Sequence, residues 1–176
     1  MPSNDTSEKI FAQWMRDHRG ILTKVSRSFA RETVDQNELV QEMMFQMWQS
    51  LPRFQGGAKP STWIYRICLN TAMQWRRTTE RRQRWIEPKA DFAAMAAESD
   101  SPAESVAQRE LLAQLYASIQ LIPAFDRALV LLALDGLAYR EIAEVTGLTE
   151  NHVGVALTRA RQRLAELMKG VVDELG

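Results

Sequence analysis

The sequence predicts an all-α protein, in which two small helical domains are joined by a flexible acidic linker and the C-terminal domain contains a helix-turn-helix. Apolar residues recur at helical spacing along most of the 176 residues, and no stretch keeps a two-residue alternation long enough to argue for strands. The segment 87–104 breaks this pattern, because it is rich in Ala, Ser, Pro and acidic residues. Residues 139–158 have the spacing of two helices that meet at a short turn.

The first domain, residues 1–86, is expected to begin with two amphipathic helices, over about 7–29 and 35–49, since apolar residues follow one stripe of each. Asp35 is the expected N-cap of the second helix, with Glu38 three residues later as in a capping box. The methionines of this helix are expected to fill the core rather than to form a docking surface.

A loop and a long helix complete the first domain. Prolines and glycines make residues 51–61 a loop. A helix then begins at Ser61 or Thr62 and runs to about Trp85, with Cys68 on its apolar face. Because Cys68 is the only cysteine, neither an internal disulfide nor a zinc site is expected. Its place on the apolar face predicts a buried, inert thiol.

The second domain, residues 105–176, is expected to hold four helices. Pro123 suits the first turn of a helix, because its φ is already helical and its missing N–H is not needed there. The expected helices span about 105–121, 123–134, 139–145 and 150–171.

The helix-turn-helix is predicted from the residues around its turn. Gly147 supplies the positive φ that ends the first helix, and Leu148 fills the corner. Thr149 is a good N-cap for the second helix. Such a motif places its second helix in the major groove of DNA, whereas an ordinary α-hairpin is the alternative. The shared apolar seam consists of Ile142, Ala143, Val153 and Leu157.

The formal net charge is zero, but the charges are segregated along the chain. Five arginines lie between Trp75 and Trp85, and six acids against two bases follow between Glu87 and Glu110. Phosphate binding depends on local patches and not on net charge, so this distribution is compatible with DNA binding. The alternative is that these arginines only solvate helix faces.

Two sets of motifs resemble those of the extracytoplasmic-function (ECF) sigma factors of bacterial RNA polymerase. Asn-Glu-Leu-Val-Gln-Glu at 37–42, Arg-Phe-Gln-Gly-Gly at 53–57 and Ser-Thr-Trp-Ile-Tyr-Arg-Ile at 61–67 resemble the promoter-melting domain. The stretch 121–164 resembles the promoter-binding C-terminal domain. The resemblance implies an alternative sigma factor that binds core RNA polymerase, recognises the −35 and −10 promoter elements and promotes DNA melting.

The resemblance also implies roles for individual residues. The Leu-Val-Gln-Glu helix docks in this family on a basic coiled coil of the polymerase clamp, which an acidic and polar face complements. The glycine-rich loop forms the pocket for an extruded base of the −10 element, and the start of the last helix reads the −35 element. The candidates are Glu38, Gln41 and Glu42 for the polymerase; Phe54, Gln55, Gly56, Gly57, Ser61, Thr62, Tyr65, Asn70, Arg76 and Arg77 for −10 DNA; and Thr149, Glu150, Asn151, His152, Val155, Arg159 and Arg161 for −35 DNA.

Some positions are ambiguous or depart from the family pattern. Trp63 has two interpretations, stacking on a base or packing in the core. Pro60 stands where an aromatic residue is common, and Gly154 and Ala156 stand where many members carry Lys and Arg. Phosphate anchoring at these two positions is lost, and Gly154 is expected to weaken its helix by roughly 1 kcal/mol relative to Ala.

Other classes of protein are less consistent with the sequence. Two histidines, one cysteine and no glycine-rich phosphate loop leave few groups for an enzyme, and no metal or cofactor is expected. The alternatives are a conventional helix-turn-helix regulator with an N-terminal sensing or dimerisation domain, and a protein-binding helical adaptor. The expected partners are core RNA polymerase, promoter DNA and an anti-sigma factor. Without a span-length apolar run or a signal peptide, a cytoplasmic protein with no membrane insertion is expected.

Overall fold

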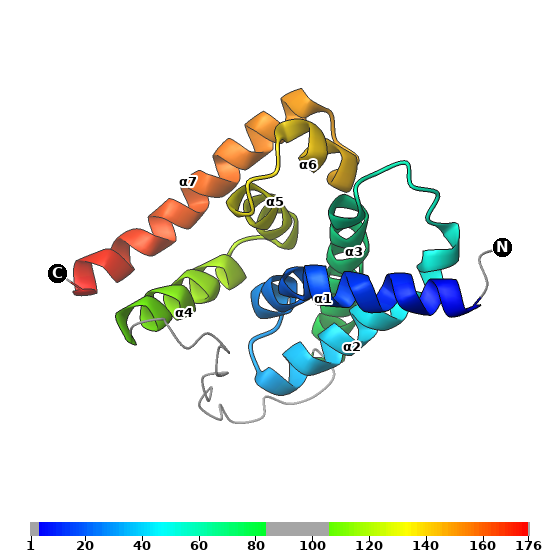
Figure 1. Cartoon of the computed structure of the whole chain (residues 1–176). Helices are drawn as coiled ribbons and strands as arrows, with labels where there is room; N and C mark the ends of the chain where they lie inside the picture. Colours follow the sequence, from blue (N-terminus) through cyan, green and yellow to red (C-terminus); the bar gives the residue numbers. More distant parts are fainter. Residues whose placement is uncertain (1–3, 84–105, 176) are drawn as a thin grey trace.

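The computed structural model of the chain describes residues 4–83 and 106–175, and these ranges are helical throughout apart from short connections (Figure 1). The predicted all-α class is therefore confirmed. Trp85 and the expected linker 87–104 lie outside the described residues. The elements are α1 (Asn4–Phe29), α2 (Thr33–Ser50), the 3-10 turn η1 (Leu51–Arg53), α3 (Pro60–Gln83), α4 (Val106–Leu121), α5 (Ala124–Leu134), α6 (Tyr139–Thr146) and α7 (Glu150–Leu175).

Helices α1, α2 and α3 pack on one another and form the first half of the molecule. Their apolar stripes meet in a shared core that includes Leu39 of α2 and Ile64 of α3. Met43 and Met47 are fully buried there, which confirms that they fill the core. Cys68 is buried as well, and burial raises the pKa of its thiol from 9.0 to about 12, as an inert thiol requires.

The predicted start of α2 is wrong. The helix begins at Thr33, and its N-cap is Glu32, whose backbone is extended and whose side chain makes no capping bond. Asp35 lies inside the first turn, where burial, Glu32 and Glu38 together raise the pKa of its carboxyl. The predicted capping box does not form. Instead, the Gln36 side-chain amide donates to the carbonyl oxygens of Ala30 and Arg31, in the connection between α1 and α2.

Two proline positions also differ slightly from expectation. Helix α3 begins at Pro60, one residue before the expected start, and a first helical position is where proline is favoured. The family departure at Pro60 is therefore compatible with the local fold. Pro123 is the N-cap of α5 and lies just outside its first turn, with φ −54° and ψ 147°.

The helix-turn-helix is formed by α6 and α7, and its predicted caps are confirmed. Gly147 ends α6 with φ 76°, and its N–H donates to the carbonyl of Ala143 at 2.9 Å. Thr149 precedes α7, and its hydroxyl accepts from the His152 N–H at 3.3 Å. The seam residues Ile142, Val153 and Leu157 are fully buried.

The two halves pack directly against each other. Helix α1 contacts α4 and α5, and α3 contacts α5 and α6 (Figure 1). The main apolar cluster continues from the first half into the second, where Leu129, Leu132 and Ile142 belong to it. A smaller cluster around Ile119 and Val130 lies within the second half. Among the described residues, no helix combines the length and apolarity needed to cross a membrane.

Candidate nucleic-acid and polymerase interfaces

The loop that precedes α3 is anchored by a cluster of three aromatic rings. The Phe54 ring meets the Trp14 ring edge-on, with centroids 5.0 Å apart, and lies 5.3 Å from the Trp63 ring. Trp14 and Trp63 are themselves 5.2 Å apart. Such contacts hold the rings in fixed positions. The structure therefore supports the core interpretation of Trp63, and Phe54 holds the near end of the loop.

The −10 candidates of this loop and of the start of α3 differ in exposure. Gln55, Gly56 and Gly57 are exposed, and Gly56 has a positive φ of 74°. Ser61 is half-buried. By contrast, Thr62 and Tyr65 retain only 3% and 2% of their exposure. In this arrangement the loop faces solvent, whereas the side chains of the first turns of α3 are largely covered.

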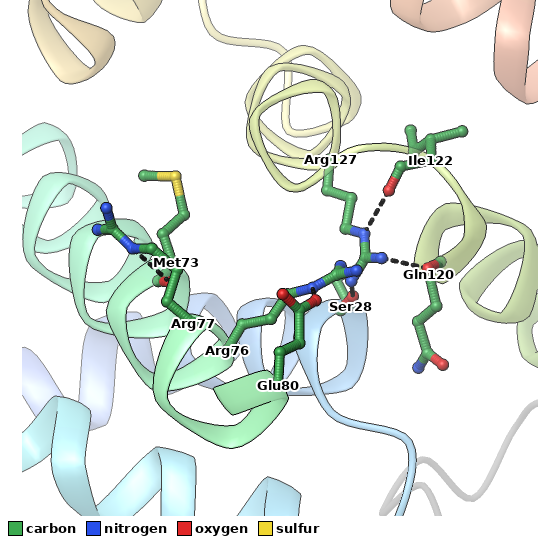
Figure 2. A network of polar contacts seen from close by, with 8 residues as sticks. All are labelled: Ser28, Met73, Arg76, Arg77, Glu80, Gln120, Ile122 and Arg127. Atoms are coloured by element: carbon green, nitrogen blue, oxygen red, sulfur yellow. Dashed lines mark hydrogen bonds and ion pairs between the residues drawn. The ribbon is translucent and has the colours of Figure 1, made fainter. Parts of the chain in front are cut away.

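Farther along α3, the remaining −10 candidates take different environments. Asn70 is exposed and lines a groove of about 420 Å³ between α2 and α3, together with the polymerase candidates Glu38 and Glu42. Arg77 is exposed and donates to the Met73 carbonyl one turn earlier. Arg76 instead pairs with Glu80 on α3 at 2.5 Å (Figure 2).

The polymerase candidates on α2 are all exposed, and Glu42 accepts from the Gln46 amide at 2.8 Å. Gln41 does not line the groove and lies on the helix face that also carries Phe45 and Trp48. Phe45 is 52% exposed, and sequence reasoning missed it. The i, i+3 spacing of Phe45 and Trp48 was the signal that could have revealed an exposed apolar patch beside Gln41.

Polar contacts join the start of α3 to the second half. The Lys59 ammonium donates to Glu141 Oε1 at 2.6 Å, which raises the pKa of Lys59 and lowers that of Glu141. Arg66 donates to the carbonyl of Glu144 in α6. An open cleft lies at this junction, lined by the loop glycines and by Arg140, Glu141 and Glu144.

A second set of contacts surrounds Arg127 of α5, which is 3% exposed. Its guanidinium donates to the carbonyls of Ile122 and Gln120 and, at 3.3 Å, to that of Ser28 in α1 (Figure 2). Burial, with a smaller effect from the nearby Arg76, lowers the pKa of Arg127 to about 10. The group therefore stays charged at neutral pH, held by carbonyl oxygens instead of a carboxylate.

The −35 candidates lie on an exposed stretch of α7. Thr149 caps the helix, and the other six candidates are all exposed, with Val155 at 54%. At roughly 100° per residue, Asn151 and Val155 share one strip with Thr158 and Gln162, opposite the buried seam. Thr158 and Gln162 are exposed, and this periodicity was the signal that could have identified them. Arg161 lies to one side of the strip.

Gly154 and Ala156 are half-buried, so neither points fully toward solvent. A Cβ on Gly154 would lie 3.4 Å from Cε2 of Tyr139 at the start of α6. The two departures from the family therefore lie near the junction of α6 and α7 and not on the outer strip.

Comparison with protein families gives two matches in the order that the motifs predicted. Residues 14–82 match Sigma-70 region 2, and residues 112–164 match Sigma-70, region 4. These ranges contain the groove between α2 and α3 and the helix-turn-helix, respectively. The fold and these two matches thus define a DNA-binding initiation factor of the sigma-70 type.

Curated relatives narrow the class. The chain is 30% identical over 167 residues to the ECF RNA polymerase sigma-E factor of Haemophilus influenzae, covering 88% of this chain and 83% of the relative. It is 27% identical over 157 residues to the RNA polymerase sigma-H factor of Pseudomonas aeruginosa, covering 83% and 79%. The chain belongs to the ECF sigma factors, which confirms the family that the motifs indicated. It is an alternative sigma factor for promoter recognition in transcription initiation.

Two solved structures share the fold. The sigma factor RpoE in complex with the anti-sigma factor NepR from Bartonella quintana matches with a TM-score of 0.71 and 21% identity, covering 92% of this chain and 98% of that one. CnrH in complex with the cytosolic domain of CnrY matches with a TM-score of 0.66 and 24% identity, covering 93% and 90%.

Proposed function

We propose that the two halves divide the work of initiation. The first half, residues 1–86, binds core polymerase through α2 and opens the −10 element around the start of α3. The second half, residues 105–176, reads the −35 element with α7, and residues 87–104 join the two as a linker. The observation that carries this proposal is that the exposed face of α2 and the exposed strip of α7 lie on separate helices of separate halves.

Polymerase docking is assigned to Glu38, Gln41 and Glu42. Their support is exposure on one helix, beside the apolar patch of Phe45 and Trp48, since a buried apolar centre with a charged rim is typical of protein interfaces. Replacing Gln41 and Glu42 with lysines should weaken binding to core polymerase in a titration.

The matched control for this experiment lies on α1. Gln13→Lys with Asp17→Lys likewise changes one exposed amide and one exposed acid to lysine, here one helical turn apart and outside the proposed dock. Its affinity should equal that of the unmodified chain. Equal affinities for both variants would exclude α2 as the docking helix.

Melting and −35 recognition are assigned to different residues. Asn70→Ala and Thr62→Ala should reduce permanganate reactivity in open complexes more than they reduce initial closed binding. Asn151→Ala and Glu150→Ala should alter preference at the −35 element, at about 1–3 kcal/mol for each good base contact. If both sets change the same step equally, the division of labour is wrong.

An anti-sigma factor is a further proposed partner. The support is similarity in fold to RpoE in its complex with the anti-sigma factor NepR. We further assign the protein to the cytoplasm, where promoter DNA and polymerase are found, and assign it no catalytic activity, metal or cofactor of its own. Recovery of the protein together with core polymerase in the cytoplasmic fraction of lysed cells tests the location.

A further inference from the structure

A pocket lies where the connection between α1 and α2 meets the C-terminal part of α3 and the corner between α4 and α5. Its volume is about 320 Å³, which is at the lower end of the ~300–1,000 Å³ that is typical of sites for small molecules. Charged groups of both signs line it, so its ligand is expected to be small and polar. The charged lining residues are Arg31, Glu32, Asp35, Arg76, Glu80 and Arg127.

Two of these arginines lie close together. Figure 2 shows Arg76 reaching from α3 toward the guanidinium of Arg127, whereas the next residue, Arg77, turns away and donates to the Met73 carbonyl. Burial, and next to it the charge of Arg76, lowers the pKa of Arg127 to about 10. Two cations at such a distance repel each other, and an anion that contacts both would offset this repulsion.

Both guanidiniums have donors to spare. A guanidinium has five N–H groups, and the three bonds of Arg127 to backbone carbonyls use three of them. Arg76 pairs through Nε with Glu80, but its Nη1 atom is buried and has no hydrogen-bond partner among the described residues. A buried, charged donor without an acceptor costs free energy, so this atom indicates that an acceptor binds in the pocket.

The neighbouring acids restrict which anion fits. Oε1 of Glu80 is already paired with Arg76, and burial raises the pKa of the Asp35 carboxyl, with smaller effects from the neighbouring Glu32 and Glu38. A fully deprotonated oxyanion, such as sulfate, has only acceptors and is repelled by carboxylates. Inorganic phosphate keeps at least one hydroxyl at neutral pH, so it donates to a carboxylate while its other oxygens accept from arginine.

The depth of the site favours a free ion over a phosphate of DNA. Arg127 is only 3% exposed, so the bulky sugar-phosphate backbone of a nucleic acid cannot approach its guanidinium. A single phosphate ion fits within 320 Å³ and reaches the donors of both arginines.

We propose that this pocket binds inorganic phosphate, in which Arg76 and Arg127 donate to the phosphate oxygens and the carboxyl group of Asp35 or Glu80 accepts from the phosphate hydroxyl. The site is separate from the proposed polymerase dock on α2 and from the strip of α7. It therefore stands or falls independently of the function proposed for those surfaces.

Isothermal titration calorimetry on the full chain, at constant ionic strength in chloride, tests this site with inorganic phosphate, sulfate and the monoester glycerol 3-phosphate. The variant Arg76→Gln removes one of the two charges and the buried Nη1 donor. The matched control is Arg77→Gln, the same change at the next residue, whose side chain is exposed and points away from the pocket. Thermal unfolding followed by circular dichroism establishes that both variants are folded.

The unmodified chain should bind phosphate at a saturable site and more tightly than sulfate. Arg76→Gln should weaken phosphate binding about tenfold, the usual effect of losing a charge-assisted hydrogen bond, and Arg77→Gln should leave it unchanged. Absence of saturable binding overturns the site, and an equal loss in the two variants overturns the role of Arg76. Equal affinity for sulfate contradicts the proposed hydroxyl contact, and tighter binding of glycerol 3-phosphate would replace the free ion by a monoester as the ligand.

Discussion

Arg127 of α5 donates from Nη1 to the carbonyl oxygen of Ser28, which lies 99 residues earlier at the end of α1. The same guanidinium also binds the carbonyls of Ile122 and Gln120, so one buried cation satisfies three backbone acceptors. Gln120 strengthens the junction, since its amide donates to the Arg27 carbonyl at 2.7 Å. The corner between α4 and α5 is therefore tied to the end of α1.

Arg127→Leu should lower the free energy of unfolding by about 2–4 kcal/mol, because it leaves the carbonyls of the cluster without their donor. Urea unfolding followed by circular dichroism measures the change. Arg16→Leu is the control, since Arg16 is exposed on α1 and its replacement should change stability by less than about 0.5 kcal/mol. A loss no larger than that of the control would mean that water readily replaces the guanidinium.

Two glycines of the helix-turn-helix should respond oppositely to alanine. At Gly147 the φ of 76° is strained for any side chain, so Gly147→Ala should cost about 1 kcal/mol. At Gly154 the added Cβ meets the Tyr139 ring at an ordinary 3.4 Å, so Gly154→Ala should stabilise α7 by up to about 1 kcal/mol. Melting temperatures compare the two. Destabilisation by Gly154→Ala would show that the Tyr139 contact is tighter than its distance indicates.

Local features of the fold were predictable from the sequence because their causes lie within a few residues. Gly147 and Thr149 mark the turn of the helix-turn-helix through backbone preference and capping, and both act where expected. The start of α2 was not predictable in this way. Asp35 is of a residue type that favours the N-cap position. The Gln36 side chain nevertheless donates to the carbonyls of Ala30 and Arg31, and these bonds fix the connection between α1 and α2.

The packing of the two halves could not be predicted from the sequence. Lys24 and Asp135 are 111 residues apart, and neither has a neighbouring pattern that names the other. Tyr65 is buried where its hydroxyl donates to Asp135 of the second half, and the pattern of α3 alone does not indicate this burial. Sequence reasoning therefore grouped Tyr65 with the exposed loop residues as a −10 candidate. Helical periodicity identifies an inner face, but a second covered face depends on the partner element.

Cys68 gives a prediction for alkaline pH. Its folded-state pKa of about 12 lies above the ordinary 9.0, so its contribution to stability is complete below pH 9 and is lost as pH rises toward 12. The free energy of unfolding should fall by up to ~1.4 kcal/mol per pH unit within that window. Cys68→Ala should lack this part of the slope while retaining that of the other groups. Parallel curves for the two proteins between pH 8 and pH 10.5 would contradict a buried thiol.

The geometry of α7 predicts a separation of base reading from phosphate binding. Asn151 lies in the first turn on the exposed strip, where a recognition helix meets base edges, whereas Arg161 lies farther along and to one side. Asn151→Ala should therefore change which −35 sequences are preferred, by about 1–3 kcal/mol at one position. Arg161→Ala should weaken all sequences alike and reduce the salt dependence of binding by about one phosphate contact.

Selection from a randomised −35 duplex library by the polymerase complex, repeated at several salt concentrations, measures both effects. Gln162→Ala is a useful third variant, because Gln162 shares the strip with Asn151 but lies three turns later, where a helix that enters the groove by its first turn is expected to have left its centre. Gln162→Ala should change sequence preference less than Asn151→Ala does, and salt dependence less than Arg161→Ala does. A change of base preference in Arg161→Ala would instead mean that α7 is rotated in the groove, with the flank of Arg161 facing the bases and the Asn151 strip facing the backbone.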